Sequence, residues 1–267
     1  MLIGTSGWQY RDWRDVLYPA GVPQSRWLEC YAGTFPVVEN NGTFYRLPGP
    51  GAFAAWRDRT PDGFTMVVKA SRYLTHIRRL RDPVEPVNRL LEAAVQLGPR
   101  LGPVLIQLPP NMTADLDALD GCLTAFAAYR PPKDAPSGVG GRNFRVRVAV
   151  EFRHETWRTE ETRSLLAHHD AALCWADRGE EPVTPLWRTA EWGYLRLHEG
   201  AGQSWPRYTS RTLRGWVKSL ADCWHSGQDV FVFFNNDQHG AAPQDAMTFA
   251  KLAREAGHEV RSASASA

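Results

Sequence analysis

Residues 64–69 read Phe-Thr-Met-Val-Val-Lys, a short apolar and β-branched run that ends on a charged side chain. A run of this kind predicts a buried strand. Similar runs recur about every thirty residues, and most are followed by helical spacing, as parallel βα units require. We expect eight strands, at residues 2–6, 35–39, 64–69, 104–108, 146–151, 172–177, 193–198 and 230–235.

The segments between these strands predict helices that turn one apolar face toward a sheet. The spacing is clearest at residues 87–95, 116–126 and 213–224. The sixth unit differs, because Pro182 and Pro185 leave room for only a short helix before the next strand.

Two segments lack any period. Residues 131–143, rich in Pro and Gly, predict a loop between a helix and a strand, which lies on the amino-terminal face of a barrel, away from its chemistry. Residues 262–267, a Ser and Ala tail, are expected to fray.

Eight strand–helix units in 267 residues predict an α/β fold with one domain over residues 1–267, a (β/α)8 TIM-like barrel. An open doubly wound sheet is the alternative, since it also buries parallel strands on both faces. The barrel is favoured because the length is typical of it and because no G-x-G-x-x-G motif follows any expected strand.

Composition excludes several classes of protein. The 31 basic and 29 acidic side chains give a net charge of +2, which provides no global attraction to nucleic acid or anionic lipid. No long apolar run and no leader-like start at Met1 are present, so we expect a cytoplasmic protein without a membrane partner. Four widely spaced cysteines without a C-x-x-C pair are expected to be reduced core thiols: Cys30, Cys122, Cys174 and Cys223.

Every expected strand ends on a polar side chain, at the end where parallel barrels carry their chemistry. These residues are Thr5, Ser6, Glu39, Lys69, Gln107, Glu151, Asp177, Arg196, His198, Asn235 and Asn236. Buried charges require partners, so the set forms either a ligand site or a self-neutralising ion-pair network. The convergence of all eight ends favours a site.

Glu39 and Glu151 lie three strands apart in the ring and are expected to face each other across the barrel. Two carboxylates in different surroundings can serve as acid and base, as in glycoside hydrolysis. Alternatively, Glu151 pairs with Arg153 or Arg196. Lys69 is compatible with a lowered pKa and Schiff-base chemistry, but we expect an ion pair with Glu39 to keep it protonated.

Other residues near the strand ends suggest ligand contacts. Trp8, Tyr10, Tyr45, Trp157 and Trp175 can stack a sugar ring or a base, although aromatics are also ordinary core residues. The basic stretch 69–81 either holds a phosphate or forms a solvated face.

A divalent metal is the alternative to a site without cofactor. The candidate ligands are Glu151, Asp177 and His198, with His76 or His154 as a further ligand. No H-E-x-x-H motif supports them, so no cofactor is assigned and a divalent metal remains the alternative.

Seven motifs run through nearly the whole chain. They are Ile3-Gly4-Thr5-Ser6-Gly7-Trp8, Thr43-Phe44-Tyr45-Arg46-Leu47-Pro48, Lys69 with Thr75-His76, Leu101-Gly102-Pro103 with Gln107-Leu108-Pro109-Pro110, Glu151-Phe152-Arg153-His154 with Trp157, Arg196-Leu197-His198, and Phe234-Asn235-Asn236-Asp237. Together they resemble the YecE-like proteins, also called domain of unknown function 72.

The resemblance implies a TIM-like barrel and no settled activity. The likeness of that fold to endonuclease-IV-type and sugar-isomerase barrels implies metal-dependent phosphodiester or sugar chemistry. Asn40 stands where the family has an aliphatic residue, and Gly42 loosens the loop behind Glu39.

The leading hypothesis is an enzyme that acts on a small polar or carbohydrate-like ligand, with Glu39, Glu151, Lys69 and His198 as catalytic residues. The expected substrate-binding residues are Trp8, Asn41, Tyr45, His76, Gln107, Arg153, His154, Trp157, Asp177, Arg196, Asn235 and Asn236. One alternative is a metal-dependent hydrolase of phosphodiesters or nucleic acid, and another is a non-catalytic metabolite-binding protein.

Overall fold

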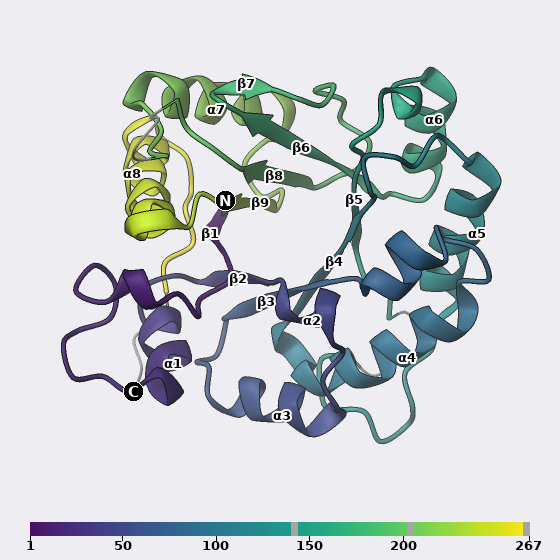
Figure 1. The fold of residues 1–267 in the computed structure, drawn as a ribbon, viewed down its shortest axis with the longest axis horizontal. Helices are drawn as coiled ribbons and strands as arrows, with labels where there is room; N and C mark the ends of the chain where they lie inside the picture. The colour runs from purple at the N-terminus through teal and green to yellow at the C-terminus, as the bar shows by residue number, and fades with distance from the viewer. Residues whose placement is uncertain (140–143, 202–205, 264–267) are drawn as a thin grey trace.

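The computed structural model describes residues 1–139, 144–201 and 206–263. Eight parallel strands close into a barrel, in which β5 pairs with β6 and β9 pairs with β1 (Figure 1). The predicted (β/α)8 architecture is confirmed. The strands are β1 (Leu2–Ser6), β2 (Val37–Asn40), β3 (Thr65–Lys69), β4 (Leu101–Gln107), β5 (Val148–Glu151), β6 (Ala172–Arg178), β8 (Gly193–Leu197) and β9 (Val230–Phe234).

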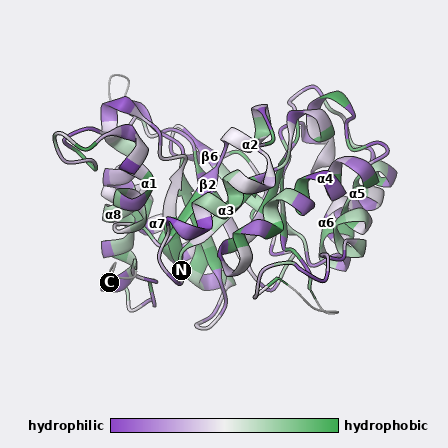
Figure 2. Cartoon of the chain, turned by 90° about the horizontal axis from the view of Figure 1, so that it is seen from below, coloured by the Kyte–Doolittle hydropathy of each residue, from purple (hydrophilic) through white to green (hydrophobic). Residues whose placement is uncertain are grey.

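Helices pack around the outside of the barrel (Figure 1). They are α1 (Trp27–Ala32), α3 (Pro50–Asp58), α4 (Val84–Ala94), α5 (Leu116–Ala128), α6 (Glu160–His168), α7 (Ser210–Cys223) and α8 (Ala241–Glu255), while the short α2 (Gly42–Tyr45) lies over the carboxyl ends of the strands. In α7, Leu213, Trp216 and Leu220 are buried, as the predicted apolar face requires. Figure 2 shows hydrophobic residues on the central strands and hydrophilic residues on outer surfaces of the helices.

Side chains inside the barrel form an apolar layer below a polar one, because alternate residues of each strand point inward. The apolar layer contains Leu2, Val37, Val67, Leu105, Ala149, Cys174, Tyr194, Phe231 and Phe233. The small Ala149 and Cys174 leave space for the large Tyr194 and Phe233 across the interior. Two residues further along, the same inward face carries Glu39, Lys69, Gln107, Glu151 and Arg196. We call this carboxyl end of the barrel the mouth.

The prediction of a short helix in the sixth unit is wrong. A hairpin stands there instead, in which β7 (Glu181–Pro182) runs antiparallel to β6. Gly179 and Glu180 both have positive φ, which is the geometry of a tight two-residue hairpin turn. Beyond it, Thr184 and Thr189 accept hydrogen bonds from the backbone N–H groups of Ala176 and Leu173 of β6.

The predicted loop at 131–143 has no regular structure over residues 131–139, and Gly138 lies against Pro99 on the amino-terminal side of β4. Residues 140–143 lie outside the described residues. Of the predicted frayed tail, residues 262 and 263 have no regular structure, and residues 264–267 are not described.

Two further features bear on the sequence analysis: the state of the cysteines and the character of the helices. All four cysteines are free thiols, but only Cys122 and Cys174 are buried, since Cys30 and Cys223 are partly exposed. Among the described residues, no helix has the length and apolar character needed to cross a membrane.

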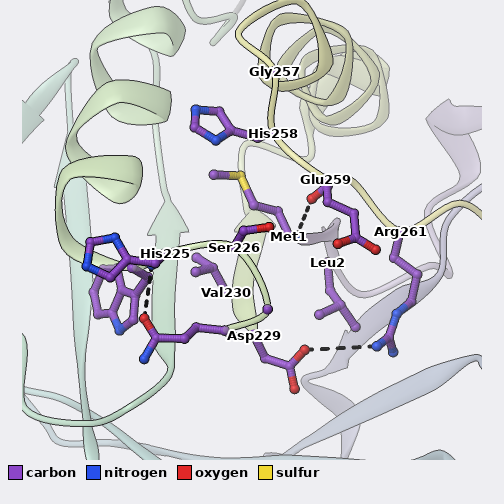
Figure 3. A pocket seen from close by; sticks show the side chains of 13 residues that line it. Met1, Leu2, His225, Ser226, Asp229, Val230, Gly257, His258, Glu259 and Arg261 are labelled. Atoms are coloured by element: carbon purple, nitrogen blue, oxygen red, sulfur yellow. Dashed lines mark hydrogen bonds and ion pairs between the residues drawn. The ribbon is translucent and has the colours of Figure 1, made fainter.

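A cavity of about 200 Å³ lies at the amino-terminal end of the barrel, opposite the mouth (Figure 3). The Met1 amine donates to the carbonyl oxygen of Glu259 at 2.6 Å, and Arg261 faces Asp229 at 3.9 Å. These contacts fasten the segment after α8 to β1 and β9, at the end of the barrel that serves stability in this architecture.

Candidate active site

The centre of the mouth is occupied by the guanidinium of Arg196, from β8. Its Nη2 donates to Glu39 Oε1 at 2.8 Å, and its Nη1 donates to Glu151 Oε2 at 2.5 Å. The three side chains are 2% exposed or less. One buried cation therefore joins the two carboxylates, which is the pairing raised above as the alternative to an acid–base pair.

Glu39 is held on both oxygens. Its Oε2 accepts from the Tyr194 hydroxyl at 2.5 Å, and the residue is 0% exposed. The neighbouring polar residue, Asn40, does not change the orientation of the Glu39 side chain, because Asn40 Oδ1 accepts a hydrogen bond from the Gly42 N–H at 3.0 Å. We infer that Glu39 positions Arg196 and does not touch a ligand.

Glu151 accepts hydrogen bonds on both oxygens as well. Besides Arg196, Gln107 Nε2 donates to its Oε2 at 2.8 Å, while Arg153 Nε donates to its Oε1 at 3.2 Å. His198 Nε2 lies 3.2 Å from the same Oε1. Burial alone raises the pKa of Glu151, but Arg196 and His198 outweigh it and hold that pKa well below its usual value. Glu151 is therefore ionised at neutral pH.

Lys69 lies beside this network without an ion pair to any described residue. Its Nζ donates to Gln107 Oε1 at 2.8 Å and sits 4.6 Å from the centre of the Phe44 ring. The expected ion pair with Glu39 is wrong, since Arg196 and Tyr194 take both oxygens of that carboxylate. Burial, followed by the charge of Arg196, lowers the pKa of Lys69 to about 8.

His198 connects Glu151 to the end of β9. Its Nδ1 lies 3.2 Å from Asn235 Nδ2, and its Nε2 faces the Glu151 carboxylate. Burial lowers the pKa of His198, so the ring is neutral at pH 7. These partners assign the proton to Nε2 and the acceptor role to Nδ1.

Arg153 and His76 form the solvent-facing rim near Lys69. The Arg153 side chain is 34% exposed, and no described residue accepts a hydrogen bond from either of its Nη atoms. His76 packs edge-on against Phe44 with ring centres 5.0 Å apart, and burial and the charge of Lys69 lower its pKa. We call Lys69, Arg153 and His76 the anion subsite.

Asp177 and Asn236 point away from the mouth, into the layer between strands and helices. The Tyr208 hydroxyl donates to Asp177 Oδ1 at 2.5 Å, and burial raises the pKa of Asp177 to about 7. Asn236 Nδ2 donates to Asp245 Oδ2 at 2.8 Å. Their roles are structural in this geometry.

The three candidate metal ligands are not brought together. Glu151 and His198 point into the barrel, whereas Asp177 points outward from β6 toward the helices. Within residues 1–139, 144–201 and 206–263, no three His, Cys, Asp or Glu side chains are placed to hold a metal ion. His154 instead accepts from the Thr156 N–H with its Nδ1, at the start of a short 3₁₀ helix.

Most of the candidate aromatics are core residues. Trp157 is 1% exposed and stacks on Phe152, and Trp8 is buried against the edge of Trp56. Tyr45 differs from them, because it is 81% exposed and packs edge-on against Phe44. Trp175 packs against Trp216 of α7. Asn41 directly precedes α2, and its buried Oδ1 has no hydrogen-bond partner among the described residues.

The basic stretch at 69–81 is largely neutralised by its surroundings. Arg78 pairs with Asp82, and Arg81 pairs with Asp115 at 3.4 Å. Arg79 reaches the carbonyl oxygen of Asn111 at 3.5 Å. For Arg78, Arg79 and Arg81 this favours the solvated-face interpretation over a phosphate site, whereas Lys69 and His76 of the same stretch lie at the mouth.

Three groups at the mouth were missing from the expected site: Tyr194, Phe44 and Asp237, the last of which interacts with the expected Tyr10. Tyr194 lies two residues before Arg196 on β8 and therefore shares its inward face. Asp237 follows β9, and its carboxyl interacts with Tyr10, whose hydroxyl donates to the carbonyl oxygen of Ser6 at the end of β1. Strand alternation could have revealed Tyr194, whereas no local pattern marks Asp237.

A closed parallel barrel with helices between its strands defines a (β/α)8 barrel protein, the architecture in which functional residues lie at the carboxyl ends of the strands. The chain belongs to the family described as Protein of unknown function DUF72, whose model matches residues 2–267.

Its relatives include the UPF0759 protein YecE of Escherichia coli (strain K12), 32% identical over 91% of this chain and 88% of that protein. The UPF0759 protein YunF of Bacillus subtilis is 26% identical over 94% of this chain and 93% of that protein. A solved structure of a DUF72 family protein from Thermotoga maritima superimposes with a TM-score of 0.74 and 25% identity, covering 95% of this chain and 99% of that one.

Proposed function

We propose that the protein is an enzyme that binds a small, polar, negatively charged ligand at the mouth and transfers a proton with Lys69. The observation that carries this proposal is the charge balance of the network. Two guanidinium groups, Arg196 and Arg153, already pair with the two carboxylates, Glu39 and Glu151. Lys69 is the additional positive charge, and it donates a hydrogen bond to the neutral side-chain amide of Gln107.

A group whose pKa lies near the working pH is suited to acid–base catalysis. Lys69 meets this condition with a pKa lowered to about 8, and Gln107 fixes its position. The ionised Glu151 supports the site by orienting Arg153 and Gln107, and the neutral His198 contacts the Glu151 carboxylate. The carboxylates thus preorganise the mouth, and proton transfer falls to the amine.

The anion subsite would hold the charged group of the ligand, because Arg153 presents unpaired Nη atoms beside Lys69 and His76. The exposed Tyr45 supplies an aromatic edge at the same rim. A ligand without negative charge would leave the excess positive charge unbalanced.

The test is a turnover screen of hydroxy acids, sugar acids and sugar phosphates with product detection by NMR, comparing wild type, Lys69→Met and Lys251→Met. Lys251 is an exposed lysine on α8 and serves as the matched control. We expect Lys69→Met to abolish turnover and Lys251→Met to retain it. Turnover that survives in Lys69→Met would contradict the proposal.

A metabolite-binding protein without turnover is the second candidate. It is favoured by one observation, that all four oxygens of Glu39 and Glu151 already accept hydrogen bonds. For this candidate, a ligand that depends on Lys69 for binding would be recovered unchanged after long incubation.

A further inference from the structure

The side of the mouth formed by β1 and β9 carries hydrogen-bonding groups instead of cations. Ser6 is 0% exposed, and its Oγ has no hydrogen-bond partner among the described residues. Asp237 Oδ1 is likewise buried and has no such partner. Buried polar atoms are normally satisfied, so two such atoms at one edge of a site point to a ligand.

Strand register places these groups across the mouth from Arg153 of the anion subsite and two strands away from Lys69 on β3. Ser6 pairs with Glu39 and shares its inward face, and the neighbouring pair joins Thr5 to Phe234 of β9. In the ring of eight strands, β1 stands opposite β5, and Arg153 follows β5 directly. A ligand that touches both sides therefore spans the mouth above Arg196.

Tyr10 completes the group on this side. Its hydroxyl donates to the carbonyl oxygen of Ser6 at 2.7 Å and also interacts with the Asp237 carboxyl. Gly7, with φ of +99°, lets the chain turn between them, since a Cβ there would come within 2.8 Å of the Tyr10 hydroxyl. We call Ser6, Tyr10 and Asp237 the hydroxyl subsite.

The Asp237 segment is held in a strained conformation. His239 has a φ of +55°, and Gly240 follows with a φ of +70°. The Trp13 indole donates to the Asp237 carbonyl oxygen at 2.9 Å, and Asp12 accepts from the His239 N–H at 2.6 Å. Strain of this kind persists where the surroundings enforce it, typically at functional sites.

The chemistry of this side is that of neutral donors and acceptors. Burial raises the pKa of Asp237 to about 8, with Tyr10 and Arg196 opposing the rise and Glu39 and Asp12 adding to it. A protonated carboxyl and two hydroxyl groups both donate and accept hydrogen bonds, as ligand hydroxyls do. A second anionic group would be repelled here by Glu39.

We infer that the mouth recognises a hydroxylated anion, a small polyol that carries one phosphate or carboxylate, with its charged end on Lys69 and Arg153 and its hydroxyls on Ser6, Tyr10 and Asp237. This inference rests on the proposed function and adds the substrate class. The anion subsite alone would accept any small anion, and the hydroxyl subsite adds the selectivity.

The test measures binding of four probes by NMR: glucose 6-phosphate, inorganic phosphate, gluconate and acetate. The protein is wild type, Ser6→Ala, Asp237→Asn, or Lys69→Met, with Ser164→Ala and Asp222→Asn as exposed controls. Circular dichroism confirms that each variant is folded.

We expect each hydroxylated anion to bind about tenfold tighter than the bare anion with the same charged group. Ser6→Ala should lower the affinity for the hydroxylated probe about fivefold and leave the bare anion unchanged, since one neutral hydrogen bond is lost. Asp237→Asn should act in the same direction, and neither exposed control should change any affinity. A preference for the phosphate or the carboxylate pair identifies the charged group.

Equal affinities for hydroxylated and bare anions, both weakened in Lys69→Met, would overturn this inference and leave the proposed function standing. Anion affinities that Lys69→Met does not change would overturn both.

Discussion

Arg196 and Glu151 form an ion pair of 2.5 Å in which the two side chains are only 1% and 2% exposed. The same guanidinium binds Glu39, so two carboxylates depend on one cation at the base of the mouth. Taking ions out of water is unfavourable unless their partners compensate, and here the partners come from β2, β5 and β8. The network therefore ties the stability of the barrel to the geometry of its site.

Replacing Arg196 by Gln should destabilise the protein by about 3 to 5 kcal/mol at pH 7, because Glu39 and Glu151 would be left buried without a cation. Urea unfolding measures this change. The control is Arg163→Gln, which removes an exposed pair with Glu160 and should change stability by about 0 to 1 kcal/mol. Losses of similar size in both variants would mean that the buried network adds nothing.

Glu151 should make stability fall in acid. A carboxyl whose folded pKa lies below its unfolded value stabilises the protein above that unfolded value, and the stabilisation disappears as pH falls through the folded pKa. The advantage of wild type over Glu151→Gln should thus be full above pH 4.5 and shrink below it. Thermal unfolding from pH 7 to pH 3 checks this, and a constant difference would contradict the prediction.

Asp177 should act in the opposite direction. Its folded pKa of about 7 lies above the usual 3.8, so the folded protein binds the extra proton and loses stability as pH rises between these values. Relative to wild type, Asp177→Asn should gain up to about 1.4 kcal/mol per pH unit in that window. Asp222→Asn, on an exposed pair with Lys218, should show no such trend.

Lys69 should titrate separately from the other three lysines of the chain, Lys133, Lys218 and Lys251. NMR of ¹³C-methylated lysines should show one signal with a pKa near 8 that is missing in Lys69→Met. Glu151→Gln should lower this pKa by removing an anion, and Arg153→Gln should raise it by removing a cation. The absence of any lysine signal with a pKa near 8 would contradict the environment described for Lys69.

The sequence predicted the strands well because each apolar run is short and bounded. β1 begins and ends where expected, and β4 starts at Leu101, before the expected Val104, since Leu101 and Gly102 extend the pairing with β3. The helix in the sixth unit was wrong because Gly179 and Glu180 adopt a hairpin turn, which their sequence does not signal strongly.

The sequence predicted which strand ends carry the polar residues of the candidate site, but not which of these residues point into the barrel. Glu39, Gln107 and Glu151 do converge, since they occupy inward positions. Asp177 does not, because it shares the outward face of Trp175, which packs under α7. Applying the two-residue alternation to each strand would have separated these two groups.

The partners within the network were beyond the sequence. Which carboxylate binds Arg196, and that Lys69 is left with an amide, depends on distances across the barrel. Asp237 is similarly placed by a loop whose conformation depends on contacts with Asp12 and Trp13, more than two hundred residues earlier.

The most direct test of the central claim is the affinity of sulfate, whose charge is constant between pH 7 and pH 9, measured by NMR across that range. If Lys69 binds the charged group of the ligand, the affinity of the wild type for sulfate should fall as pH rises through about 8. The affinity of Lys69→Met for sulfate should be lower and should not change with pH. Lys251→Met should follow the wild type. An affinity that is the same in wild type and Lys69→Met at every pH would contradict the account.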